Sequence, residues 1–309
     1  NYTFDDSFNE KHIEEVLKLD LVDVALVKSA RFKVVVDAVN STGGFMVPNL
    51  LKKMGVECVK LFCDPNGQFP HNPEPLPENL TEISKLVVSE RADFGIVVDP
   101  DVDRLALVCE DGSMFGEEYT LVTVADFVLS KTPGNTVSNL SSTRALSDIT
   151  NKHKGSYEAS AVGEVNVVER MKATNAVIGG EGNGGVIYPE MHYGRDSLIG
   201  IALFLTQLAE RKISARTLRD SYPNYFISKN KMELTPEIDL NFIFTALKEK
   251  FKHEKITIID GLKIDFKEGW VHLRKSNTEP IIRIYSESKG EDKANALAEN
   301  MINEIKKLI

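Results

Sequence analysis

The stretch Asp99-Pro100-Asp101-Val102-Asp103-Arg104, here called the aspartate loop, lies between two apolar runs, residues 94–98 and 105–108. Its three carboxylates repel one another unless a positive group is bound, because Arg104 is the one cation beside them. Carboxylate oxygens suit Mg²⁺, which takes its remaining ligands from water or phosphate. We therefore expect a loop between two buried strands that binds Mg²⁺ through Asp99, Asp101 and Asp103, close to a phosphate group.

Three other interpretations of the aspartate loop were weighed. An EF-hand requires glycine where Arg104 stands, and it is flanked by helices rather than strands. A haloacid-dehalogenase-type phosphatase also has Asp-x-Asp after an apolar strand, but a hydroxyl residue takes the place of Asp103. The third is a solvated acidic turn, since a lone motif has weak specificity. Two further polar loops, described below, argue against it.

Composition limits the class of protein. A chain of 309 residues with 42% hydrophobic and 27% charged residues is typical of a globular protein with about two domains, or three small ones. A net charge of −9 argues against nucleic acid or an anionic membrane as the main partner. The three cysteines form no Cys-x-x-Cys, and the longest apolar stretch, residues 198–205, is too short to cross a membrane. We expect a cytoplasmic location.

The order of apolar patterns predicts the fold. Residues 1–30 have a helical pattern, capped at Asp6 or Ser7, with no strand beside them. Strands and helices then alternate twice, which favours mostly parallel sheets buried on both faces. In the last part, strands cluster between two helices. We expect two tandem mixed-sheet α/β sandwich domains, residues 31–133 and 134–227, followed by an α+β domain, residues 228–309.

A second polar stretch, the basic turn, is Arg274-Lys275-Ser276-Asn277-Thr278-Glu279-Pro280. Backbone N–H groups of such a turn can form an anion-binding nest, and an arginine supplies a fork that fits phosphate. Arg283, on the strand that follows, would reach the same anion. The turn therefore predicts phosphate binding, and a polar hairpin tip exposed to solvent is the alternative.

A third stretch, the glycine loop, spans residues 179–185 and matches G-x-G-x-x-G from Gly180 to Gly185. A dinucleotide site needs a helix to begin at this loop, whereas residues 186–188 have the pattern of a strand. Glycines keep the backbone thin, so that Glu181 and Asn183 can form hydrogen bonds to a polyhydroxylated ligand. The glycine loop therefore favours a sugar-like ligand over a nucleotide.

Together, the three stretches in this order and spacing resemble the metal, sugar and phosphate loops of the α-D-phosphohexomutases, which include phosphoglucosamine mutases, phosphomannomutases and phosphoglucomutases. This resemblance implies four domains around one cleft and a phosphoserine within a Ser-His-Asn sequence of the first. The chain contains no Ser-His-Asn, and its nearest equivalent is Pro70-His71-Asn72-Pro73. We expect the chain to comprise the second to fourth domains, residues 1–30 being a linker from the missing N-terminal domain, and to be inactive alone.

The resemblance also implies a role for each loop. The aspartates would hold Mg²⁺ beside the phosphoserine, and Arg104 would steady its phosphoryl group. Glu181 and Asn183 would bind sugar hydroxyls, and the distal phosphate would be held by Arg274, Ser276, Asn277 and Thr278. Hexose 6-phosphate and hexose 1-phosphate would interconvert through a hexose 1,6-bisphosphate. Some members have a histidine in place of Gly185, so the general base is unassigned.

One further stretch of the sequence bears on which hexose is preferred. Residues 162–166, Val-Gly-Glu-Val-Asn, resemble a substrate-contacting loop of the phosphoglucosamine and phosphomannose mutases. Glu164 would suit an amino group, which favours glucosamine phosphate, although it would equally cap a helix. The six histidines share no metal-ligand spacing, and His192, with Arg195 and Asp196, is a second-rank site candidate. Two other classes stay open, a metal-dependent phosphatase with Asp99 or Asp101 as nucleophile and a non-catalytic sugar-phosphate binding module.

Overall fold

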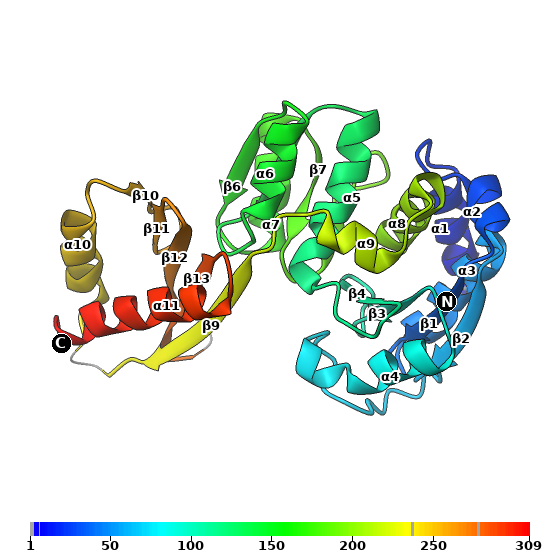
Figure 1. Ribbon diagram of the computed structural model, residues 1–309, viewed down its shortest axis with the longest axis horizontal. Coiled ribbons are helices and arrows are strands. Elements are labelled where there is room, and N and C mark those ends of the chain that lie inside the picture. Colours follow the sequence, from blue (N-terminus) through cyan, green and yellow to red (C-terminus); the bar gives the residue numbers. More distant parts are fainter. Residues whose placement is uncertain (1–2, 6, 236–237, 277–278) are drawn as a thin grey trace.

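The computed structural model describes residues 3–5, 7–235, 238–276 and 279–309, and its three sheets confirm the predicted fold class. Figure 1 shows α11 and the C-terminus at one end of the molecule and the first helices at the other. Asp6, one of the two expected caps of the first helix, lies outside the described residues. Among the described residues, no helix combines the length and the apolar character needed to cross a membrane.

Two sheets have the same topology. In the first, the order is β2-β1-β3-β4, with β1 parallel to β2 and β3, and β4 antiparallel to β3. In the second, the order β6-β5-β7-β8 repeats this arrangement, with β8 as the antiparallel edge. The elements of the first unit are α1 (Ser7–Leu17), α2 (Val24–Ala30), β1 (Lys33–Asp37), α3 (Gly43–Met54), β2 (Glu57–Leu61), the 3₁₀ turn Pro77–Asn79, α4 (Thr81–Ser89), β3 (Phe94–Val98) and β4 (Leu105–Cys109).

The second unit follows directly. Its elements are α5 (Glu117–Lys131), β5 (Asn135–Asn139), α6 (Ala145–Lys152), β6 (Tyr157–Ser160), α7 (Glu164–Thr174), β7 (Ala176–Glu181), β8 (Gly185–Ile187), α8 (Ser197–Arg211) and α9 (Ala215–Asp220). The sequence pattern missed α9, which is only six residues long. Because the two units repeat one topology, the aspartate loop after β3 and the glycine loop after β7 occupy equivalent hairpins.

The two α/β units share one apolar core, which extends from Ile13 on α1 to Tyr222 beyond α9. Phe204 of α8 contacts Phe94 of β3 edge to face at 5.2 Å between ring centroids, and it contacts Phe115 at 5.6 Å. These three rings are fully buried. The shared core fixes the orientation of the two equivalent hairpins relative to each other.

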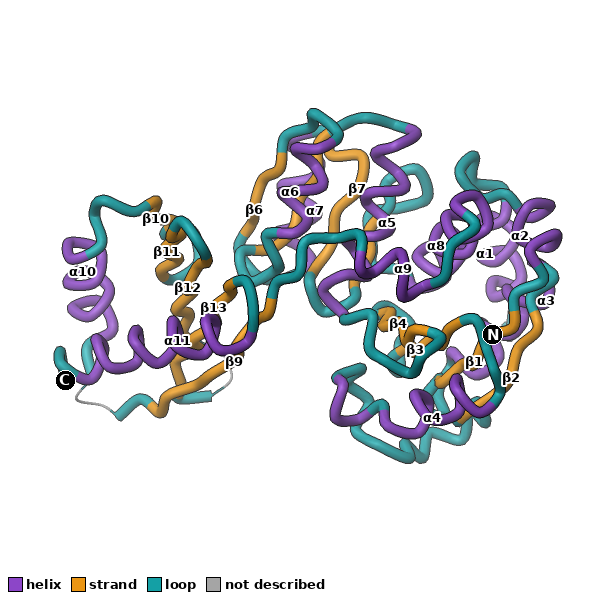
Figure 2. Tube along the Cα trace, viewed as in Figure 1, coloured by secondary structure: helices purple, strands orange, loops and turns teal. Residues whose placement is uncertain are grey.

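The third unit has a core of its own around an antiparallel sheet of order β10-β11-β12-β13-β9. Figure 2 shows α10 and α11 beside its strands, and side chains of both helices pack in one core with the sheet, as expected for an α+β domain. Helix α10 begins at Leu240 because the carboxylate of Asp239 accepts the backbone N–H groups of two following residues. The elements are β9 (Phe226–Glu233), α10 (Leu240–Lys250), β10 (Lys255–Thr257), β11 (Leu262–Phe266), β12 (Gly269–Lys275), β13 (Ile281–Ser288) and α11 (Glu291–Lys306).

Buried hydrogen bonds connect this third unit to the loop that follows β5. Lys263 donates to the carbonyl of Leu140 at 2.7 Å. His272 is 2% exposed, and its Nε2 lies 2.7 Å from the carbonyl oxygen of Asp260, so this nitrogen carries the proton. Its Nδ1 then accepts from the hydroxyl of Ser141 at 2.9 Å. The hydrogen bond between His272 of the third unit and Ser141 therefore requires a neutral imidazole.

The contact at His272 predicts acid sensitivity. Burial lowers the pKa of His272 to about 4, below the unfolded value of about 6.5, so stability is lost as pH falls from about 6.5 towards 4. Between pH 7 and 5 the contribution of His272 to the free energy of unfolding falls by about 2 kcal/mol. Glutamine keeps hydrogen-bonding capacity but does not titrate. We therefore expect the free energy of unfolding of His272→Gln to fall by about 2 kcal/mol less than that of the wild-type protein between pH 7 and 5. Urea unfolding followed by the fluorescence of Trp270 measures this free energy at each pH. An equal dependence on pH in the wild-type protein and in His272→Gln would contradict the prediction.

Candidate functional site

The aspartate loop is held in a strained, well-anchored conformation. Val102 has a φ of 61°, a left-handed conformation that costs a branched residue about 1–3 kcal/mol. The carbonyl of Pro100 accepts hydrogen bonds from the hydroxyls of Ser41 at 2.5 Å and Thr42 at 2.9 Å, at the start of α3. The backbone N–H of Ser197 donates to the carbonyl of Val102 at 3.1 Å. The loop is therefore fixed from both α/β units.

The three carboxylates of this loop converge. Each offers one oxygen, and these oxygens lie within 4.8 Å of one another. Burial raises the pKa of Asp99 to about 7, and the charges of Asp103 and Asp101 act in the same direction. One oxygen of Asp103 is buried without a hydrogen-bond partner among the described residues. Such a cluster fits a divalent cation, because the cation would satisfy the free oxygen and cancel the repulsion.

The glycine loop is joined directly to the aspartate loop. The backbone N–H of Leu105 donates to the carbonyl of Gly184 at 3.0 Å. Gly184 has a φ of 93°, and a β-carbon there would lie 2.5 Å from the carbonyl oxygen of Leu105, so glycine is required. The amide oxygen of Asn183 accepts from the N–H of Gly185 at 3.3 Å. The two predicted binding loops therefore meet through their backbones.

Glu181, at the end of β7, is 5% exposed and fully paired. One of its oxygens accepts from the side-chain amide of Asn139 at 2.7 Å and from the N–H of Gly163 at 3.2 Å. Its other oxygen accepts from Nη1 of Arg195 at 2.8 Å. The sequence singled out Glu181 but not Asn139, which stands at the carboxyl end of β5, where ligands bind in open α/β sheets.

Arg195 connects three acidic residues. Its Nη2 donates to Asp103, and its Nη1 donates to Glu181. Its Nε lies 3.2 Å from Oε2 of Glu164, and Oε1 of Glu164 accepts the backbone N–H of Arg195 at 3.1 Å. The side chain of Arg195 is 13% exposed. Sequence reasoning ranked Arg195 second, whereas the geometry gives it a central position. Glu164 is held by this arginine, and its assignment to the sugar stays a prediction.

The basic turn lies at the end of a hairpin that pairs Arg274 of β12 directly with Arg283 of β13. Opposed residues of an antiparallel pair point to the same face, so both guanidinium groups face one side. The Nε of Arg283 is buried without a hydrogen-bond partner among the described residues. Ser276 is buried, and its N–H donates to Ile281 at 3.0 Å. Asn277 and Thr278, predicted in the same site, lie outside the described residues.

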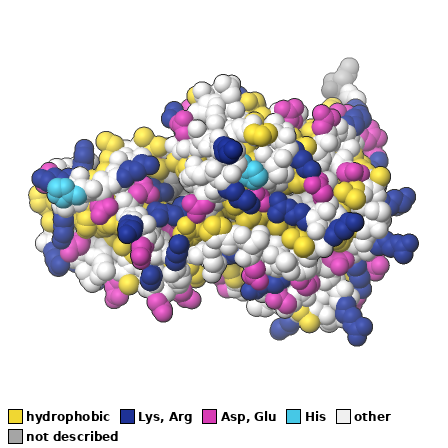
Figure 3. Space-filling model, turned by 45° about the horizontal axis from the view of Figure 1, so that its top comes forward, with side chains coloured by type: hydrophobic (Ala, Val, Ile, Leu, Met, Phe, Trp, Pro, Cys, Tyr) yellow, Lys and Arg dark blue, Asp and Glu magenta, His cyan; other side chains and the backbone are white. Residues whose placement is uncertain are grey.

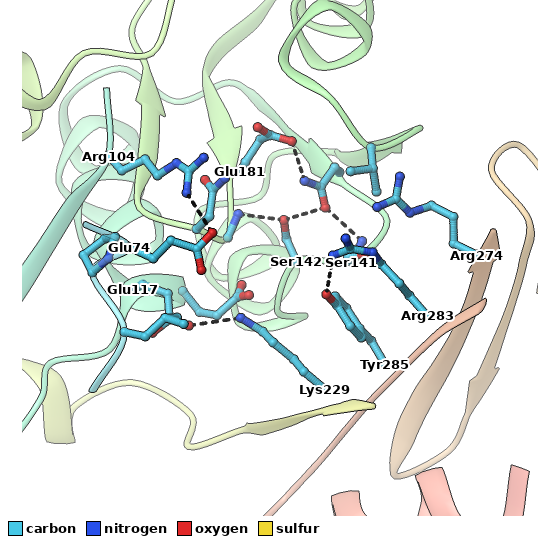
Figure 4. A pocket seen from close by; sticks show the side chains of 17 residues that line it. Glu74, Arg104, Glu117, Ser141, Ser142, Glu181, Lys229, Arg274, Arg283 and Tyr285 are labelled. Carbon is cyan, nitrogen blue, oxygen red and sulfur yellow. Dashed lines mark hydrogen bonds and ion pairs between the residues drawn. The ribbon is translucent and has the colours of Figure 1, made fainter. Parts of the chain in front are cut away.

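All three loops border one cavity of about 410 Å³ (Figure 4). Arg104 comes from the aspartate loop, Glu181 and Asn183 from the glycine loop, and Arg274 and Arg283 from the third unit. Asp99, Asp101, Asp103 and Glu164 are not among the residues that line it. Val162 and Gly182 lie in stretches that the sequence had singled out, whereas the lining residues outside any predicted stretch are Glu74, Pro75, Leu76, Glu117, Glu118, Asn139, Ser141, Ser142, Lys229 and Tyr285.

Charged side chains that line this cavity pair with one another. Lys229 of β9 donates to Glu117 at 3.2 Å, and Arg104 lies 3.9 Å from Glu74 (Figure 4). Burial raises the pKa of Glu118 well above its usual range, although its carboxylate accepts the N–H of Thr143 at 2.8 Å. Figure 3 shows Lys and Arg side chains among Asp and Glu on the face that it presents. The cavity is therefore polar and carries both signs of charge.

Known proteins with similar sequences and structures include several mutases. The chain is 38% identical over 277 residues to a phosphoglucomutase/phosphomannomutase of Thermococcus kodakarensis, covering 88% of this chain and 60% of that protein. It is 31% identical over 297 residues to a phosphoglucosamine/phosphogalactosamine mutase of Sulfurisphaera tokodaii, covering 94% and 64%. A crystal structure of a phosphoglucomutase/phosphomannomutase family protein from Burkholderia thailandensis matches with a TM-score of 0.84 and 27% identity, covering 96% and 64%.

The chain spans less than two thirds of the length of these relatives. Three models of the phosphoglucomutase/phosphomannomutase family match it in succession. Alpha/beta/alpha domain II matches residues 10–112, alpha/beta/alpha domain III matches residues 116–225, and the C-terminal domain matches residues 237–304. These matches cover most of the chain and follow the order of its three sheets. The chain therefore belongs to the phosphoglucomutase/phosphomannomutase family, the α-D-phosphohexomutases.

Proposed function

We propose that this chain is part of a phosphohexomutase that interconverts hexose 6-phosphate and hexose 1-phosphate through a hexose 1,6-bisphosphate. The observation that carries the proposal is the single cavity bordered by Arg104, by Glu181 and Asn183, and by Arg274 with Arg283. These groups offer a phosphoryl-binding cation, acceptors for sugar hydroxyls and a distal anion site. The names of the relatives support the same activity.

Each end of the cavity has its own task in this proposal. Arg274 and Arg283 hold the phosphate that does not react, since paired guanidinium groups match the geometry of a phosphate. Glu181 and Asn183 orient the hexose through its hydroxyls. Arg104 steadies the phosphoryl group that is transferred. Such chemistry depends mainly on positioning and on charge neutralisation around a loose transition state.

The metal and the phosphoryl donor complete the proposed site. Asp99, Asp101 and Asp103 would hold Mg²⁺, which when bound supplies positive charge to the phosphoryl group in transfer. The donor would be a phosphoserine that these 309 residues do not contain, since the sequence has no Ser-His-Asn segment.

The aspartate loop provides the decisive test. In the complete protein with Mg²⁺ and hexose 1,6-bisphosphate, we expect Asp101→Asn to lower kcat/KM for hexose 1-phosphate at least about 100-fold, because a metal ligand is lost. Asp292→Asn, which neutralises an exposed carboxylate at the start of α11, should leave the rate unchanged. The assay follows hexose 6-phosphate and inorganic phosphate together.

Each alternative class gives a different result in that assay. Release of inorganic phosphate without isomerisation would favour a phosphatase that uses Asp99 or Asp101 as nucleophile. Binding of hexose phosphate without bisphosphate-dependent exchange would favour a non-catalytic binding module. Equal rates for wild-type protein and Asp101→Asn would contradict the proposed metal site.

For the sugar, we propose glucosamine phosphate ahead of mannose and glucose phosphates, on the basis of Glu164. We expect Glu164→Gln to lower kcat/KM for glucosamine 6-phosphate relative to glucose 6-phosphate by about tenfold, the effect of one lost charge-assisted contact. Rates on glucosamine, mannose and glucose 6-phosphates measure this preference. An equal loss on all three sugars would mean that Glu164 acts only by holding Arg195, and the assignment to the amino group would be wrong.

A further inference from the structure

A second group of metal-binding side chains lies away from the cavity, where the first helix meets α8. His12 comes from α1, His192 from the segment after β8, and Asp196 is the N-cap of α8. The Nε2 atoms of His12 and His192 lie 2.7 Å and 3.0 Å from the same carboxylate oxygen, Oδ2 of Asp196. The ligand atoms of the three side chains all lie within 4.8 Å of one another.

The two oxygens of Asp196 have different partners. Oδ1 accepts the backbone N–H groups of Leu198 at 2.8 Å and Ile199 at 3.3 Å, which caps α8 and fixes the carboxylate. Oδ2 is left for the two imidazoles. Asp196 is 6% exposed, whereas the side chains of His12 and His192 are 31% and 39% exposed. The cluster therefore has a rigid buried base and a side open to solvent.

We propose that His12, His192 and Asp196 form a binding site for a divalent transition-metal ion of the Zn²⁺ class, separate from the aspartate loop. Two imidazole nitrogens and one carboxylate oxygen suit Zn²⁺ or Co²⁺, whereas Mg²⁺ prefers oxygen ligands alone. Ligand atoms at about 2.0–2.1 Å from a tetrahedral zinc ion lie about 3.3 Å apart. The observed separations of 2.7 Å and 3.0 Å are about 0.6 Å and 0.3 Å shorter than this, and the two Nε2 atoms lie within 4.8 Å of each other, so small side-chain rotations are enough to admit the ion.

An ion at this site would fasten α1 to the start of α8. Asp196 follows Arg195, whose guanidinium joins Asp103 to Glu181. Three protein ligands leave one tetrahedral position for water on the open side. The ion would therefore stiffen the backbone that carries Arg195 and would hold α1 in place, without touching the cavity.

Cobalt and zinc binding to the chain test the proposal. In the Asp101→Asn background with millimolar Mg²⁺, which weakens competition from the aspartate loop, we expect one equivalent of Co²⁺ to give visible d–d absorption that Zn²⁺ abolishes. His12→Gln and His192→Gln should each weaken Zn²⁺ binding at least about tenfold. His253→Gln, an exposed histidine in the segment after α10, is the matched control and should leave the affinity unchanged.

Glutamine distinguishes a metal site from a hydrogen-bonded cluster, because its amide can still donate to Asp196 but does not replace imidazole as a ligand. The metal-free variants should melt close to the parent, and Zn²⁺ should slow hydrogen exchange in α1 of the parent alone. Absence of the Co²⁺ absorption would overturn the proposal. So would equal Zn²⁺ affinities in His12→Gln, His192→Gln and the His253→Gln control.

Discussion

The guanidinium of Arg195 holds together carboxylates from three segments that are far apart in the sequence. Asp103 belongs to the aspartate loop, Glu181 to the glycine loop and Glu164 to the start of α7. Glu181 is almost completely buried, so without a cation it would be an uncompensated charge, which costs about 3–5 kcal/mol. Asp103 and Glu181 can therefore share one region of the molecule because Arg195 lies between them.

The repeated topology explains why these carboxylates meet. In both α/β units the last parallel strand returns through an antiparallel edge strand, so the aspartate loop and the glycine loop occupy the same place in each unit. Their hairpins pair through Leu105 and Gly184, and the shared core around Phe204 keeps the units from rotating apart. A repeated topology thus places an acidic hairpin and a glycine-rich hairpin at equivalent positions, next to each other.

Local patterns predicted much of this arrangement. The apolar runs beside Asp99 and the alternation of strands and helices gave the fold class, because a sheet buried on both faces needs such runs. Spacing did not predict the partners of Arg195, since those contacts depend on how two units pack. The same holds for His12 and His192, which share no motif and both contact Asp196. Long-range pairing of single charged residues leaves no periodic signal in a sequence.

Positive and negative charges are unevenly distributed across the cavity. The third unit contributes the cations Lys229, Arg274 and Arg283, whereas the α/β units contribute one cation, Arg104, and the acidic groups, among them Glu117 and Glu118 on α5 and Glu181 on β7. An anion is therefore favoured beside the third unit and beside Arg104, and it is repelled by the acidic wall. Hydroxyl groups are the better partners for that wall, since they can donate to carboxylates. In the proposed function, a phosphorylated sugar would satisfy the cations and the acidic wall at once, which neither inorganic phosphate nor an uncharged sugar could do.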